Sequence, residues 1–352
     1  MGSTEPKLVV TEPELIKQIL SNKEGIFPKI KLKGLVKKIF GDGIVVAEGE
    51  KWLKLRKLAN HSFHGDCLKD MVPAMIASVE TMLDKWRYHE GKEIEVCDGF
   101  KLLTSEVISR TAFGSSYLEG QEIFALLTKL SSLISRNALK IRFFGIRKFI
   151  RTKDEIEAEK VEKLLNESIM EIVEKRQDEV ITGQASSFGS DFLGLLLKVH
   201  HDMDRGNQKS ASDLIDECKT LYSPLTTITR RIERKVKLGK YEFPANVDLI
   251  ILPLALHMNP DIWGKDAHLF KPERFSEGLA KATNGNAVSF LGFGFGPRIC
   301  VGLNFASNEA KITLSMILQR HKFTLSPNYV HSPFVVLMTQ PQHGVQILLQ
   351  PL

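Results

Sequence analysis

The chain has 352 residues, of which 43% are hydrophobic and 26% charged, a composition typical of a soluble globular protein with a large core. Its formal net charge is +6, but its basic clusters lack the interleaved aromatic residues of a single-stranded nucleic-acid site, so no nucleic acid is expected as a partner. No stretch reaches the roughly 18 apolar residues of a membrane span, and four cysteines without a C-x-x-C pair argue against a zinc site or a disulfide framework.

Helical patterns dominate the first two-thirds of the chain. Thr11 and Glu14 form a predicted capping box that opens a helix at "PELIKQIL". Apolar periodicity predicts further helices, over about 67–87, 99–113 and 121–139.

A long charged helix is predicted over 154–180. Its narrow apolar stripe is formed by Ile156, Val161, Leu164 and Ile169. Two polar, glycine-containing segments are predicted as surface loops, "GQASSFGSD" (183–191) and "HHDMDRGNQKS" (200–210).

The pattern changes after Tyr222. Short strands are predicted in "KVKLGKYEFPANVDLIILP" (235–253) and irregular coil in "WGKDAHLFKPERFSEG" (263–278). A helix is expected to run from shortly after Cys300 to about Arg320, followed by two or three strands. Its apolar side is formed by Phe305, Ile312, Met316 and Ile317. We therefore expect one domain over 1–352 that is mainly α with small β-sheets.

One cysteine lies in a loop of unusual composition, "FLGFGFGPRICVG" (290–302). The pattern consists of five positions within a stretch of ten, namely Phe293, Gly296, Arg298, Cys300 and Gly302. From average residue usage, a chance match in a chain of this length is on the order of one in ten thousand. An isolated cysteine is usually a small buried hydrophobe, but its neighbours here favour another interpretation.

Each neighbour suits a thiolate that binds a flat ligand. Glycines let the backbone approach such a ligand closely, and a helix that begins after Cys300 directs its positive end toward the sulfur. Arg298 supplies a permanent cation that pairs with carboxylates. The pattern therefore predicts Cys300 as an axial iron ligand.

This loop resembles the haem-binding loop of the cytochrome P-450 superfamily, the haem-thiolate monooxygenases. "PERF" (272–275) resembles the coil before that loop, and "WLKLR" (52–56) resembles a helix whose Trp and Arg contact a haem propionate. Three further segments are similar to plant members of the branch that includes secologanin synthase and gibberellin-inactivating hydroxylases: "TAFGSSYLEGQEIF", "DLIDECKTLY" and "SPNYVHSPF".

The resemblance implies a cytochrome P-450 fold around haem b, with Cys300 as the metal ligand. It implies that Trp52, Arg56 and Arg230 reach haem propionates, with Phe293, Gly296, Arg298 and Gly302 in the binding loop. Without the loop, Trp52 and Arg56 would be one core and one surface residue, and Arg230 a surface arginine at a strand edge.

The implied reaction inserts one oxygen atom from O2 into a small hydrophobic plant metabolite, terpenoid or gibberellin-like. Electrons would come from NADPH through a flavoprotein, cytochrome P-450 reductase. Full-length relatives would sit on the endoplasmic reticulum membrane. This chain lacks their anchor and first strands, so a cytoplasmic location with at most peripheral membrane contact is expected.

The sequence also departs from the family. The Ala-Gly-x-Asp/Glu-Thr motif of the oxygen-binding helix and the Glu-x-x-Arg motif are both absent, as if a segment were deleted between Tyr222 and Ser223. The junction from Glu217 to Tyr222 imitates Glu-x-x-Arg-Leu-Tyr with Thr220 in the arginine's place, which we interpret as coincidence. No intact catalytic residue is therefore assigned, and Arg274 is expected to lose its partners. The alternative function is a catalytically incompetent, truncated family member.

Overall fold

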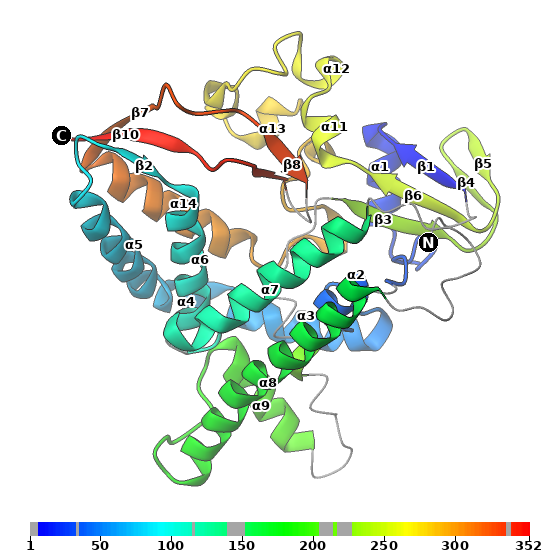
Figure 1. The fold of residues 1–352 in the computed structure, drawn as a ribbon. Coiled ribbons are helices and arrows are strands. Elements are labelled where there is room, and N and C mark those ends of the chain that lie inside the picture. Colours follow the sequence, from blue (N-terminus) through cyan, green and yellow to red (C-terminus); the bar gives the residue numbers. More distant parts are fainter. Residues whose placement is uncertain are drawn as a thin grey trace. The chain divides into compact units, whose positions relative to one another are not determined.

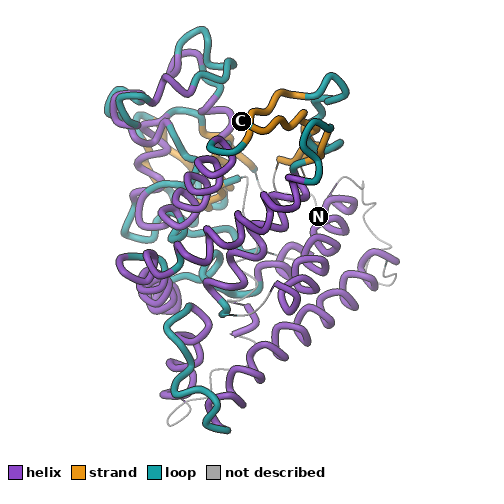
Figure 2. The backbone as a smooth tube through the Cα atoms, turned by 90° about the vertical axis from the view of Figure 1, so that its left-hand side faces the viewer, coloured by secondary structure: helices purple, strands orange, loops and turns teal. Residues whose placement is uncertain are grey.

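The computed structural model describes residues 6–32, 35–114, 117–138, 152–203, 214–216, 227–335 and 339–352. Helices make up most of this part of the chain and the strands are short (Figures 1 and 2), which confirms the predicted fold class. The expected junction between Tyr222 and Ser223 lies outside the described residues. So does Cys218.

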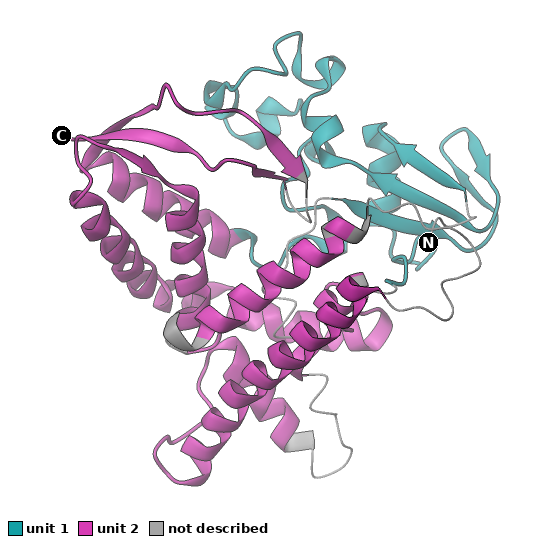
Figure 3. Ribbon diagram, in the orientation of Figure 1, with its two compact units in different colours: residues 1–32, 225–303 teal, residues 33–224, 304–352 magenta. Residues whose placement is uncertain are grey.

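The chain divides into two compact units, each built from two segments that are distant in sequence (Figure 3). Unit 1 comprises residues 1–32 and 225–303, and unit 2 comprises 33–224 and 304–352. The expectation of a single domain over 1–352 stays a prediction.

Unit 1 contains short strands and short helices around one mixed sheet. In chain order they are β1 (Lys7–Val10), α1 (Pro13–Ser21), β3 (Ile228–Ile232), β4 (Val236–Leu238), β5 (Tyr241–Phe243), β6 (Val247–Ile251), α11 (Pro253–His257), α12 (Pro260–Trp263), η2 (Pro272–Phe275), α13 (Leu279–Ala282), η3 (Ala287–Ser289) and η4 (Gly296–Arg298). The sheet has the order β1-β6-β3, with β1 parallel and β3 antiparallel to β6, and β4 pairs with β5 as a hairpin.

The core of unit 1 joins α1 to this sheet and to the cysteine loop. Ile16 and Leu20 of α1 pack in the same cluster as Leu249 of β6, as Val288 just before the loop and as Leu291 within it. Burial of apolar area of this kind is the main favourable term in folding. The loop therefore rests on a packed base.

The predicted capping box at α1 is wrong. Helix α1 begins at Pro13 with Glu12 as its N-cap, and no side chain caps it. Glu14 instead accepts a hydrogen bond from the Asn286 side chain at 3.1 Å, so a tertiary contact takes the carboxylate that a local cap would have used.

Unit 2 holds the long helices. They are α2 (Leu35–Phe40), α3 (Gly49–Ser62), α4 (Gly65–Asp70), α5 (Val72–Arg87), α6 (Cys97–Ala112), α7 (Tyr117–Ala138), α8 (Lys153–Ile181), α9 (Phe192–Met203) and α14 (Leu303–Leu318). The boundary with unit 1 lies after Leu303, the first residue of α14. The strands of unit 2 are β2 (Glu93–Glu95), β7 (His321–Leu325), β8 (Pro333–Val335), β9 (Thr339–Pro341) and β10 (Gln346–Pro351). They form a β2-β10-β7 sheet and a β8-β9 hairpin. The described residues after α14 thus contain four strands, where two or three were expected.

The predicted long helix is present as α8, but its apolar stripe differs from the prediction. Val161 and Ile169 are buried as expected, whereas Ile156 and Leu164 are 42% and 48% exposed. Ala158, Leu165 and Val173 complete the buried stripe instead. The predicted stripe is wrong at two positions because the partner helix, which the sequence does not reveal, selects the buried face.

Three other helix predictions need correction or confirmation. The helix expected over 67–87 is two helices, α4 and α5, separated at Met71. The helices expected over 99–113 and 121–139 are confirmed as α6 and α7 with small changes in their ends. The loop expected over 200–210 begins later, since α9 continues to Met203, and the remainder lies outside the described residues. Within the described residues, every helix is too short or too polar to cross a membrane.

Candidate functional site

The loop over 290–302 is organised by hydrogen bonds within its own backbone. The Gly294 N–H donates to the Leu291 carbonyl at 3.1 Å, and the Cys300 N–H donates to the Phe293 carbonyl at 2.9 Å. Gly294 has φ +77°, a conformation that favours glycine. The Cys300 side chain is exposed, and the cysteines in the described part of the chain form no disulfide.

Gly296 is required by packing within unit 1. Its φ is +73°, and a Cβ there would lie 2.3 Å from the carbonyl oxygen of Leu20. Both facts exclude any other residue without a shift of α1. The sequence assigned Gly296 to ligand contact, and the structure gives it a separate, structural role.

Gly302 differs from Gly296, because open space lies beside it. A Cβ at Gly302 would meet only the Cys300 Sγ within 4 Å, at 3.8 Å. An exposed thiol beside backbone that carries no side chain leaves room for a flat group. The residues of the loop therefore fit the proximal face of a haem.

Phe293 and Arg298 are half-buried and lie in the same loop as Cys300. Arg298 ends the short helix η4, and the Ile299 N–H closes that turn on the Gly296 carbonyl at 3.0 Å. The structure thus brings together five of the predicted site residues.

Arg230 is buried within unit 1, with 7% of its surface exposed. Alternation along β3 places it on the same face as Ile228 and Ile232, which pack in the core cluster that includes Leu291. Its guanidinium donates to the Thr229 carbonyl at 2.8 Å. This position contradicts the alternative of a surface arginine and suits a partner inside the fold.

Trp52 and Arg56 lie one turn apart on α3 of unit 2, and both are half-buried. Arg56 Nε donates to Asn60 Oδ1 at 3.0 Å, which fixes its side chain along the helix. Their predicted approach to a haem propionate stays a prediction.

The expectation that Arg274 would be left without partners is wrong. Its guanidinium donates to the Trp263 carbonyl, and to both the carbonyl and the carboxylate of Asp266 at 3.2 Å. Hydrogen bonds from Lys271 and Arg274 lower the pKa of Asp266. The hydrogen-bonding groups of the arginine are therefore satisfied within the coil before the loop, because the acceptors belong to residues close to it in sequence.

Sequence reasoning missed His257 and Asp266. His257 ends α11 and its ring stacks on that of Phe290, and Asp266 pairs with Arg274. Neither belongs to a spaced motif. Only the packing of unit 1 shows that they contact the loop and the coil before it.

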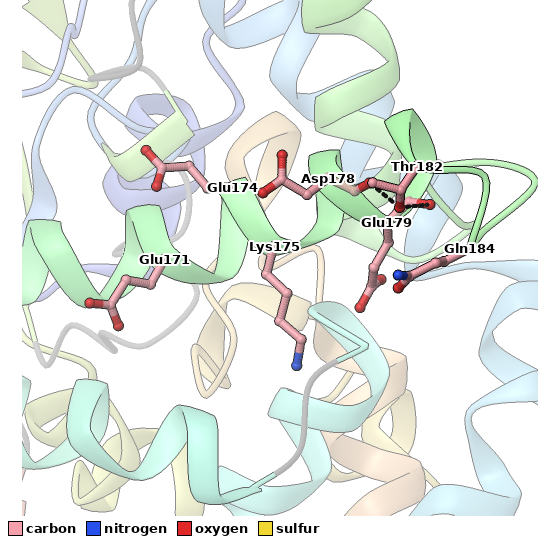
Figure 4. A pocket seen from close by; sticks show the side chains of 7 residues that line it. All are labelled: Glu171, Glu174, Lys175, Asp178, Glu179, Thr182 and Gln184. Carbon is pink, nitrogen blue, oxygen red and sulfur yellow. Dashed lines mark hydrogen bonds between the residues drawn. The ribbon is translucent and has the colours of Figure 1, made fainter.

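An acidic depression of about 430 Å³ lies on the C-terminal part of α8, in unit 2 (Figure 4). It is lined by Glu171, Glu174, Lys175, Asp178, Glu179, Thr182 and Gln184. The side chains of Glu174 and Asp178 point away from that of Lys175, so the charged groups do not converge (Figure 4). A depression with this lining does not suit an apolar, anionic macrocycle. Within the described residues no group of His, Cys, Asp or Glu is arranged to hold a metal ion.

A family model described as Cytochrome P450 matches the chain in two segments, residues 1–222 and 211–347. The crystal structure of a cytochrome P450DA heme domain superposes with a TM-score of 0.80 over 98% of this chain and 87% of that one, at 18% identity. This likeness concerns the fold.

Relatives from plants match nearly the whole chain. Cytochrome P450 CYP749A22 of Panax ginseng is 46% identical over 410 residues, covering 98% of this chain and 78% of the relative. The 11-oxo-beta-amyrin 30-oxidase of Medicago truncatula is 35% identical (99% and 79%), and the 7-deoxyloganic acid hydroxylase of Catharanthus roseus is 33% identical (99% and 80%). The 410-residue alignment exceeds the 352 residues of this chain, so part of the relative's aligned sequence has no counterpart here.

Proposed function

Because this chain belongs to the cytochrome P450 family, whose members are haem monooxygenases, we propose that its 290–302 loop binds haem b with the Cys300 thiolate as the iron ligand. The observation that carries the proposal is the exposed Cys300 thiol beside the open backbone of Gly302, in a loop with a packed base. A thiolate-bound haem supplies oxygen activation, since the thiolate donates electron density that favours O–O cleavage.

The arginines hold the propionates of this haem. Arg230 faces the interior of unit 1, where a guanidinium is costly to bury unless an anion or hydrogen bonds compensate it. Arg298 lies in the loop itself, and the family resemblance also assigns Trp52 and Arg56 of α3 to a propionate. Guanidinium groups suit carboxylates because their donors match both oxygens.

The substrate is a small hydrophobic plant metabolite of the terpenoid or gibberellin-like class. Two relatives support this class, since one is named as an oxidase of 11-oxo-beta-amyrin and the other as a hydroxylase of 7-deoxyloganic acid. Electrons come from NADPH through a flavoprotein reductase, whose acidic surface meets exposed lysines such as Lys54 and Lys57 on α3.

The test is a carbon monoxide difference spectrum of the reduced, haem-supplemented full chain. A strongly red-shifted Soret band is expected for the wild type and for Cys67→Ser, a matched control on α4. Loss of this band is expected for Cys300→Ser, because a hydroxyl is a poor substitute for a thiolate ligand. The proposal fails if wild type and Cys300→Ser give the same spectrum.

A second candidate function is a haem-binding family member that oxygenates poorly. The two family-model segments support it, because the first ends at residue 222, where the oxygen-binding helix and the Glu-x-x-Arg helix are expected to follow and no such motif does. We propose that the segment between Tyr222 and Ser223 is missing from this chain. Inserting the corresponding segment of the Panax ginseng relative is expected to raise NADPH- and reductase-dependent product formation well above that of the chain as it stands. Equal turnover by both chains would contradict this candidate.

A further inference from the structure

His257 contacts the beginning of the cysteine loop in two ways. Its Nε2 accepts a hydrogen bond from the Leu291 N–H at 3.0 Å. Its ring stacks on that of Phe290, with 5.0 Å between centroids and 19° between planes. An imidazole that accepts at Nε2 carries its proton on Nδ1 and is neutral. Burial lowers the pKa of His257, which favours this neutral form.

Backbone hydrogen bonds connect this contact to the cysteine. The Leu291 N–H is held by His257, and the Leu291 carbonyl accepts from Gly294, which closes a turn over 291–294. The Phe293 carbonyl within that turn accepts from the Cys300 N–H at 2.9 Å. The Leu291 amide held by His257 is therefore linked to the Cys300 amide through the 291–294 turn and one further backbone hydrogen bond.

Neighbouring aromatic rings hold His257 in place. Phe290 contacts Phe275 edge to face at 5.7 Å, and Phe275 contacts Trp263 at 5.8 Å. The Trp263 indole N–H donates to the Leu256 carbonyl at 2.9 Å, one residue before His257 on α11. The series of ring contacts thus begins and ends at α11, the helix that contains His257. Such aromatic pairs prefer edge-to-face and offset arrangements, which restricts the positions of the rings.

From this geometry we propose that His257 is a positioning residue for the Cys300 thiolate, acting through the Leu291 amide and the 291–294 turn. The inference rests on the proposed function, since it concerns how the iron ligand is oriented. It assigns no contact between His257 and haem. An acceptor at this position fixes the turn, and packing of the ring alone does not.

Two substitutions separate the acceptor from the ring. His257→Phe keeps a flat ring against Phe290 and removes the acceptor, whereas His257→Gln places an amide oxygen near the position of Nε2 without a ring. His268→Phe is the matched control, because His268 is exposed in the same unit. The first measurement is hydrogen–deuterium exchange of the full chain without added haem, at the Leu291 and Cys300 amides.

We expect the Leu291 amide to exchange at least about tenfold faster in His257→Phe than in wild type, the factor given by losing a hydrogen bond worth roughly 1.4 kcal/mol. The Cys300 amide, whose own acceptor is the Phe293 carbonyl, is expected to exchange faster as well, because the turn that holds this acceptor is loosened. His257→Gln and His268→Phe are expected to exchange like wild type. Equal protection in His257→Phe and wild type, or no rescue by His257→Gln, overturns the proposal.

The second measurement is the carbon monoxide difference spectrum of the same variants with haem. His257→Phe is expected to give a larger share of the species with nitrogen-ligated or displaced-thiolate character, and His257→Gln to restore the wild-type share. If wild type itself lacks the red-shifted band, the proposed haem-thiolate function fails, while the exchange result still decides whether His257 orders the loop. An unchanged band ratio in His257→Phe contradicts the positioning role even where haem binds.

Discussion

The guanidinium of Arg274 and the carboxylate of Asp266 lie 3.2 Å apart, within the coil that leads to the Cys300 loop. Family resemblance predicted that Arg274 would lack partners in this chain. The coil instead supplies the Asp266 side chain and two backbone carbonyls. A segment that looked dependent on a distant Glu-x-x-Arg helix is thus held by its own residues.

Replacing Arg274 tests this local role. Arg274→Ala leaves the Trp263 and Asp266 carbonyls without their donor, and we expect it to lower the free energy of unfolding by about 1–3 kcal/mol. Arg320→Ala is the matched control, since Arg320 pairs with Glu80 at 3.8 Å on the surface and such pairs contribute about 0–1 kcal/mol. Denaturant unfolding followed by circular dichroism measures both. A change in Arg274→Ala no larger than in Arg320→Ala would contradict the local role.

The two glycines of the loop should respond differently to alanine. Gly296→Ala meets the Leu20 carbonyl at 2.3 Å and a positive φ, so we expect it to destabilise the chain with or without haem. Gly302→Ala meets only the Cys300 Sγ at 3.8 Å, so we expect unchanged stability without haem and weaker haem binding. Thermal unfolding without haem and haem titration separate the two effects. Unimpaired haem binding by Gly302→Ala would argue that the open backbone is not the haem face.

Two adjacent arginines of β3 face opposite sides and should affect different properties. Arg230 faces the core of unit 1, whereas Arg231 pairs with the buried Asp248 at 3.2 Å. We expect Arg230→Met to weaken haem affinity about tenfold to a hundredfold, the loss of one charge-assisted hydrogen bond. Arg231→Met should mainly destabilise the fold, because it leaves Asp248 buried without its cation. Haem titration and chemical unfolding of both variants check this, and equal haem affinity in Arg230→Met and wild type would remove Arg230 from the site.

Glu309 of α14 should make stability depend on pH. Its side chain is buried, its Oε1 has no hydrogen-bond partner among the described residues, and burial raises its pKa from 4.5 to about 7. The folded state therefore holds a proton that the unfolded state has released, and stability falls as the pH rises from about 4.5 to about 7.

Glu309→Gln removes that dependence. Relative to wild type, we expect the variant to gain on the order of 2–3 kcal/mol more at about pH 8 than at about pH 5. Glu122→Gln, on an exposed part of α7, is the control and should show no such trend. Urea unfolding at both pH values measures the difference. A pH-independent gain would mean that Glu309 is ionised in the folded chain at about pH 5 as well.

The amino-acid sequence alone determined which residues could ligate iron and which class of fold to expect. The motif is local, since it consists of Phe293, Gly296, Arg298, Cys300 and Gly302. A local motif can be recognised from the sequence because its residues lie in one loop regardless of how the rest of the chain packs. Helical periodicity likewise located α6, α7 and α8, since a helix repeats its buried face every 3.6 residues.

Only the tertiary structure decided which face each element buries and what the loop rests on. Ile156 and Leu164 of α8 are exposed although they fit the predicted stripe, and Gly296 is fixed by Leu20, which lies far from it in sequence. His257 accepts a hydrogen bond from Leu291, 34 residues later in the chain. Such contacts depend on how distant segments pack against one another. Because the packing of each element depends on all the others, these contacts cannot be predicted from the spacing of residues along the chain.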